Sequence, residues 1–72
     1  MRLCVLRFAN NQDLTRAFDR VLTSPDVESC VVEWEESRIR FIAPSEGALQ
    51  LAERVYLDGG LLWCSHHDVD KS

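Results

Sequence analysis

Hydrophobic positions recur at every second residue from Arg2 to Phe8, which is the period of a β-strand. The side chains divide between two faces, with Cys4, Leu6 and Phe8 on one and Leu3, Val5 and Arg7 on the other. The period then becomes that of a helix, whose apolar stripe consists of Leu14, Ala17, Phe18, Val21 and Leu22. Asn10 and Asn11 are suitable N-cap residues before this stripe, and Pro25 ends it. The sequence therefore begins with a strand followed by a helix.

Two further alternating segments, residues 27–35 and Arg38–Ala43, predict a β-hairpin with Glu36 and Ser37 as its loop. In this register Glu35, Glu33 and Val31 would face Arg38, Arg40 and Ile42 on one side, and Trp34, Val32 and Cys30 would face Ile39, Phe41 and Ala43 on the other. A slip of one residue would destroy both sets of pairs. The loop lacks the asparagine or glycine typical of two-residue turns. A slightly longer loop is therefore an alternative prediction.

A second helical stripe follows the hairpin and consists of Ala48, Leu51, Ala52, Val55 and Tyr56. Ser45 is the expected N-cap of this helix, and Gly59 with Gly60 is expected to end it. A last strand should run from Leu61 to about His66, with either face buried, and residues 68–72 should form a flexible polar tail.

The order strand, helix, strand, strand, helix, strand indicates an α+β fold in which each apolar stripe packs on one sheet face. With right-handed crossovers it predicts a two-layer βαββαβ ferredoxin-like sandwich with the antiparallel sheet order 4-1-3-2. We expect residues 1–72 to form a single small domain.

Composition narrows the possible partners and the compartment. The net charge of −4 argues against nucleic acid, and Phe41, the aromatic on the third strand, is expected in the core rather than on an RNA-binding face. The apolar runs are too short to span a membrane, and Arg7 interrupts the first one too early for a signal peptide. Three cysteines without a Cys-x-x-Cys pair fit free thiols in a reducing compartment. We therefore expect a cytoplasmic protein.

The segment Cys64-Ser65-His66-His67-Asp68 is the sharpest cluster of candidate metal ligands, with Cys64, His66 and His67 as the candidates. In a strand His67 would point away from the other two, and we expect Cys64 on the open face while Cys4 and Cys30 lie in the core. Four ligands then do not assemble, so we expect no metal, no cofactor and no catalytic residue. A small thiol or metal-binding protein that uses Cys64 and His66 is the alternative hypothesis.

The outer face of the sheet should be more apolar than a solvated face. Leu3, Val5, Val31 and Ile42 would lie on it, with Leu62 as a further candidate and with Arg7, Glu33 and Arg40 as a charged rim. This pattern predicts a non-catalytic binding or regulatory module whose open sheet face contacts a protein partner or forms a homodimer.

Overall fold

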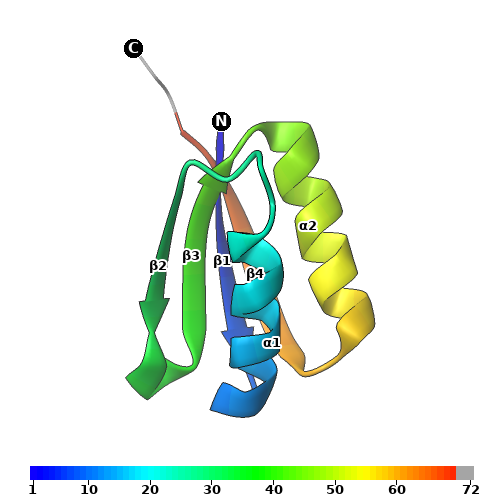
Figure 1. Ribbon diagram of the computed structural model, residues 1–72. Helices are drawn as coiled ribbons and strands as arrows, with labels where there is room; N and C mark the ends of the chain where they lie inside the picture. The colour runs from blue at the N-terminus through cyan, green and yellow to red at the C-terminus, as the bar shows by residue number, and fades with distance from the viewer. Residues whose placement is uncertain (70–72) are drawn as a thin grey trace.

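The computed structural model describes residues 1–69, which form a sheet of four strands covered on one face by two helices (Figure 1). In chain order the elements are β1 (Arg2–Phe8), α1 (Asn11–Leu22), β2 (Ser29–Glu33), the 3₁₀ turn η1 (Trp34–Glu36), β3 (Arg38–Ala43), α2 (Ser45–Asp58) and β4 (Leu61–Asp68). The sheet is antiparallel in the order β2-β3-β1-β4, which is the predicted order counted from the other edge. The predicted ferredoxin-like α+β sandwich is confirmed. The sheet face turned away from the helices is called the open face below.

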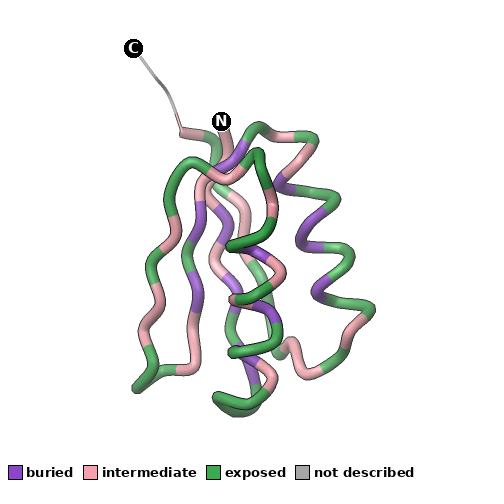
Figure 2. Tube along the Cα trace, viewed as in Figure 1, coloured by how far each residue is buried: buried purple, intermediate pink, exposed green. Residues whose placement is uncertain are grey.

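The core lies between the helices and the sheet, and buried positions alternate along β1 and β3 (Figure 2). The sheet contributes Cys4, Leu6, Phe8, Ile39, Phe41 and Ala43, and the helices contribute Leu14, Ala17, Val21, Ala48, Leu51, Ala52 and Val55. Phe41 is fully buried, as expected for a core residue rather than a nucleic-acid-stacking one. The two apolar stripes and the alternating strand faces thus form one core.

Leu22 and Tyr56 were expected in the helical stripes, but they are 60% and 67% exposed. Each is the eighth residue after the start of its stripe, and eight residues turn a helix about 80° past that start. The buried members lie between about 60° on one side of that start and about 40° on the other, so this last member points out of the layer. The predicted core was therefore one residue too wide on each helix.

The caps of the two helices differ. The Oδ1 of Asn10 accepts a hydrogen bond of 2.9 Å from the backbone N–H of Asp13, which confirms Asn10 as the N-cap of α1. At α2 the prediction of Ser45 was wrong, because Pro44 occupies the cap position and makes no side-chain bond, and Ser45 is already helical. Gly59 and Gly60 end α2 as predicted, with φ angles of 91° and 85°.

The hairpin register is shifted by two residues from the predicted one. Glu33 lies opposite Arg38, not Arg40, and Val31 lies opposite Arg40, not Ile42. The loop is longer than two residues because Trp34 to Glu36 form a 3₁₀ turn, which Ser37 closes in the left-handed conformation at φ 51°. A shift of two residues leaves every side chain on its predicted face, so the face assignment survives while the pairs change.

The last strand is longer than predicted and ends at Asp68, which pairs with Arg2 in the sheet and forms a 3.4 Å ion pair with it. Val69 then donates a backbone hydrogen bond of 3.0 Å to Met1. The predicted tail therefore does not begin at residue 68, and residues 70–72 lie outside the described part. Within residues 1–69 neither helix combines the length and the apolar character needed to cross a membrane.

Candidate functional site

The open face is organised in three rows, each of which takes one residue from every strand. The first row is Ser29, Ile42, Leu3 and His67, the second is Val31, Arg40, Val5 and Ser65, and the third is Glu33, Arg38, Arg7 and Trp63. All the residues that the sequence predicts for an interface lie in these rows except the additional candidate Leu62. Leu62 falls at an irregularity between Leu61 and Trp63, where the register of β1 and β4 shifts.

The apolar residues gather at one end of the open face. Leu3 and Ile42 are direct neighbours on β1 and β3, and both are half-buried. In the next row Val31 and Val5 lie on either side of Arg40. Val31 is 48% exposed. A shallow depression of about 250 Å³ runs between these rows, with Leu3, Val31, Arg40 and Ile42 among its walls. A solvated sheet face normally alternates to polar side chains, so this end is unusually apolar.

The other end of the open face carries an ion cluster of Glu33, Glu36, Arg38 and Arg40. Arg38 donates two hydrogen bonds of 2.9 and 2.8 Å to the Glu33 carboxylate and lies 2.6 Å from that of Glu36. Arg40 approaches Glu33 to 3.2 Å. The hydrogen bonds from Arg38 lower the pKa of Glu33, and the same contact raises the pKa of Arg38. The cluster thus pairs both arginines of β3 with the carboxylate of Glu33 on β2.

Arg7 completes the third row without joining this cluster. It lies directly opposite Arg38 on one side and Trp63 on the other, and it forms no ion pair within residues 1–69. Trp63 is 44% exposed at the edge strand. The charged end of the face therefore has negative charge on β2 and an unpaired positive charge on β1.

The histidines of β4 lie on opposite faces of the sheet. His67 pairs with Leu3 on the open face, whereas His66 pairs with Cys4 and Cys64 pairs with Leu6, both on the helix side. Cys64 was expected on the open face, and that prediction was wrong. The sequence could not decide the matter, because Leu61, Leu62 and Trp63 are consecutive apolar residues and the register shift beside them is not visible in the pattern.

The thiol cluster consists of Cys4, Cys64 and His66. The Cys4 Sγ lies 3.2 Å from Nδ1 of His66, and the Cys64 Sγ lies 3.6 Å from Nε2 of the same ring. The two sulfurs thus contact opposite ring nitrogens, and an ion bound to one nitrogen would not meet both thiols. Within residues 1–69 no group of three or more histidine, cysteine or acidic side chains is arranged to hold a metal. Burial raises the pKa of Cys4 to about 11, and the nearby positive charge of Arg2 opposes this only in part.

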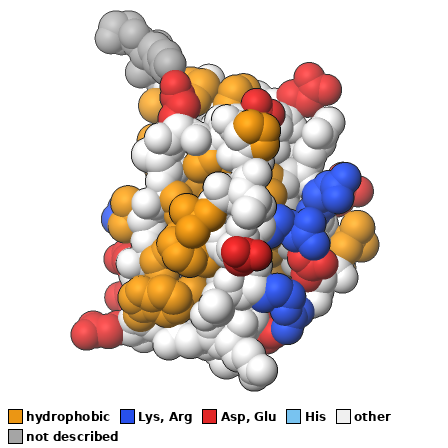
Figure 3. Space-filling view, in the orientation of Figure 1, with side chains coloured by type: hydrophobic (Ala, Val, Ile, Leu, Met, Phe, Trp, Pro, Cys, Tyr) orange, Lys and Arg blue, Asp and Glu red, His pale blue; other side chains and the backbone are white. Residues whose placement is uncertain are grey.

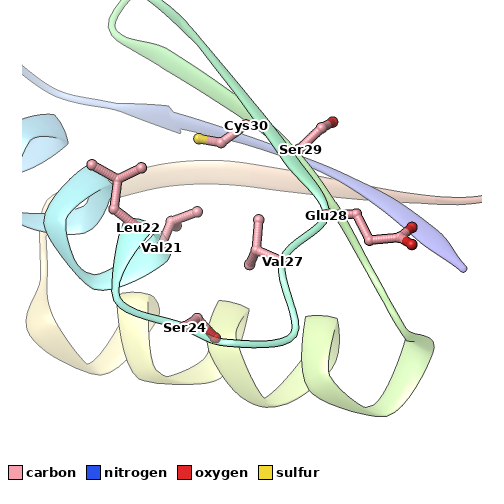
Figure 4. A pocket seen from close by; sticks show the side chains of 7 residues that line it. All are labelled: Val21, Leu22, Ser24, Val27, Glu28, Ser29 and Cys30. Atoms are coloured by element: carbon pink, nitrogen blue, oxygen red, sulfur yellow. The ribbon is translucent and has the colours of Figure 1, made fainter.

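A second apolar surface lies on the helix side, along the line between α1 and the edge strand β2 (Figure 3). Phe18 and Trp34 stack edge-to-face there with ring centroids 6.2 Å apart. Next to them is a side groove, which is lined by Val21, Leu22, Val27 and Cys30 and holds about 220 Å³ (Figure 4). The sequence analysis did not identify this surface, because the predicted register paired Trp34 with Ile39 inside the sheet and the predicted stripe buried Leu22.

Comparison of the chain with models of protein families, with curated proteins and with solved structures finds no match. The function of the protein is therefore inferred from its own geometry and chemistry.

Proposed function

We propose that this protein is a non-catalytic binding module of the cytoplasm, and that the open face of its sheet binds a second copy of the chain. The observation that carries the proposal is the cluster of Leu3, Val5, Val31 and Ile42 on the sheet face that neither α1 nor α2 covers (Figure 1). Apolar residues gathered on one exposed face and bordered by charge are typical of an interaction surface. Its three free cysteines suit a reducing compartment.

The arrangement of the rows favours a copy of the same chain over an unrelated partner. β1 and β2 lie on either side of β3, so a two-fold axis along β3 places β1 of one copy over β2 of the other. Val5 then faces Val31 of the partner subunit, and Ile42 faces its own copy. In the third row Arg7 faces Glu33 of the partner subunit, which gives the unpaired arginine a carboxylate.

The arginines on this axis do not oppose the contact strongly. Arg38 and Arg40 would approach their own copies, but both are held by Glu33, and Arg38 also by Glu36. The charges of the two arginines are therefore partly neutralised before the two copies meet. The carboxylates of Glu33 and Glu36 belong to β2 and the turn that follows it, and β2 is the strand that faces β1 and Arg7 of the partner subunit.

The size of the face predicts a weak and reversible dimer. With the axis along β3, only β2, β3 and β1 of the two copies overlap. Three strands about 4.8 Å apart and a strand length of five residues give a contact face of roughly 14 by 17 Å. Two such faces bury less than the roughly 1,200 Å² at which stable interfaces begin. Contacts of this size belong to transient complexes, which fits a module that assembles and separates.

Sedimentation equilibrium over a wide concentration range tests the proposal. The wild type should approach twice its 8.3 kDa mass as the concentration rises into the high micromolar range. Val31→Lys combined with Ile42→Glu should remain monomeric and folded, because both side chains are solvent-accessible in the monomer and would be buried in the dimer.

Two control variants separate this face from other apolar surfaces. Leu57→Lys on α2 and Leu22→Lys at the side groove alter exposed leucines of the two helices, outside the rows of the open face, and should leave the association unchanged. Loss of the dimer in Leu22→Lys, but not in the open-face variant, would assign the interface to the side groove. A wild type that stays monomeric throughout would refute the proposal.

A further inference from the structure

The thiol cluster connects two strands through one imidazole ring. Cys4 on β1 and His66 on β4 are direct cross-strand partners, and Cys64 lies two residues before His66 on the same face of β4. The sulfur–nitrogen distances of 3.2 and 3.6 Å place His66 between the two thiols. Cys4 is fully buried and Cys64 is exposed, so a reagent in solution reaches the Cys64 thiol but not the Cys4 thiol.

The three groups have the relation of nucleophile, base and orienting group. With its proton on Nδ1, His66 donates to the Cys4 sulfur and directs the free electron pair of Nε2 toward the Cys64 thiol. Cys4 fixes the ring in this orientation, as the third group of a catalytic triad does when it accepts the second N–H of a catalytic histidine. Burial raises the pKa of Cys4 to about 11, so Cys4 stays a neutral thiol near neutral pH and acts on the ring of His66 without becoming a nucleophile itself.

We propose that Cys64 is a reactive cysteine that captures a low-molecular-weight disulfide, with His66 as its base and Cys4 as a positioning residue. The proton of the Cys64 thiol passes to Nε2, and the thiolate attacks one sulfur of the disulfide. A Cys64–sulfur bond forms as the bond between the two disulfide sulfurs breaks, and the second sulfur leaves as a thiolate. The imidazolium returns the proton to that thiolate, so one mixed disulfide and one free thiol result.

The remaining cysteines are unsuited to this reaction. Cys4 has no exposed surface, and an adduct on it would require the core to open. Cys30 is half-buried in the side groove, where burial raises its pKa, and no side chain of residues 1–69 makes a hydrogen bond to it (Figure 4). The thiolate is the nucleophile in disulfide exchange, so both should react slowly. Cys30 is therefore an internal control for a partly accessible thiol without a histidine.

The rate of reaction with dithionitrobenzoate, an aromatic disulfide that releases a coloured thiolate, tests the proposal on the folded protein. One thiol per chain should react in a fast phase near neutral pH, and peptide mass analysis should locate the adduct at Cys64. Cys64→Ser should abolish the fast phase. His66→Asn should slow it by roughly tenfold or more near pH 7 and approach the wild-type rate in alkaline solution, where a thiolate forms without a base.

Matched variants show whether Cys64 reacts fast because His66 acts as its base or only because the thiol is exposed to solvent. His67→Asn changes the neighbouring histidine, which faces the other side of the sheet, and should leave the rate unchanged. Cys4→Ala should give an intermediate rate and a pH profile shifted toward that of His66→Asn, because the ring loses its orienting contact. A fast phase that survives in His66→Asn at pH 7, or an adduct on Cys30, would overturn the proposal. Neither result would bear on self-association, which involves the opposite face.

Discussion

Arg38 holds the carboxylate of Glu33 with two hydrogen bonds of 2.9 and 2.8 Å across the first pair of the β2–β3 hairpin. This contact exists only because the loop contains four residues rather than two. The same pair anchors the ion cluster at one end of the open face and leaves Arg7 of β1 outside it. The register of one hairpin thus decides the charge distribution on the surface through which we expect the protein to act.

The Glu33–Arg38 contact predicts a specific acid dependence. A carboxyl whose pKa is lowered in the folded state adds stability above its ordinary pKa, here 4.5, and loses that stability as the pH falls below it. In Arg38→Gln the pKa of Glu33, followed by NMR titration of its carboxyl carbon, should rise toward the ordinary value. Arg54→Gln on α2 is the control and should leave it unchanged. If Arg40→Gln caused the larger rise, the two-residue hairpin loop would be correct instead.

Gly60 is predicted to be less replaceable than its neighbour Gly59. Both have positive φ angles, but a Cβ at Gly60 would overlap the side chain of Asp13, whereas one at Gly59 would meet open space. Gly59→Ala should lower the free energy of unfolding by about 1 kcal/mol through backbone strain alone. Gly60→Ala should cost roughly twice as much, because Asp13 must also leave its place in the first turn of α1. If urea denaturation gave the same loss of unfolding free energy for both variants, Asp13 would be shown to move aside without cost.

Burial of Cys4 predicts a loss of stability in alkaline solution. The pKa of this thiol is about 11 in the folded protein against 9.0 for an ordinary cysteine, so the folded state retains the proton longer. Its contribution is complete below pH 9 and disappears as the pH rises from 9 to 11, by about 2–3 kcal/mol at most. The slope of unfolding free energy against pH in this window should be shallower in Cys4→Ala than in the wild type. An unchanged slope would mean that Cys4 is solvated in the folded state.

The sequence pattern predicted the fold because hydrophobic residues recur with a different period in strands and in helices, and the period shows which face of each element is buried. Alternation assigned Cys4, Leu6 and Phe8 to the core and Leu3 and Val5 to the open face, and the structure places all five there. The register of the hairpin was predicted wrongly because the period of the hydrophobic residues does not determine which residues pair across two strands. A two-residue slip of the hairpin preserves every face, so the pattern could not distinguish the partners of Glu33.

The candidate thiol cluster was hidden from the sequence for a related reason. The segment from Leu61 to Trp63 is apolar throughout, so nothing in it shows which face of β4 turns toward the helices. The approach of His66 to Cys4 depends on the pairing of β1 with β4, and those residues are 62 positions apart. Contacts between residues so far apart in the sequence depend on the register of the assembled sheet, which the hydrophobic pattern within one strand does not show.

The central claim is that two copies meet through their open faces along β3. Isotope-filtered nuclear Overhauser spectroscopy on a concentrated mixture of labelled and unlabelled protein tests it most directly. Within one chain Val5 and Val31 lie on strands separated by β3, about 9–10 Å apart and too far for such a contact. The account predicts an intermolecular contact between the Val5 and Val31 methyl groups and one between Ile42 and its own copy. Intermolecular contacts from Leu22 and Trp34 instead would contradict it and assign the interface to the side groove.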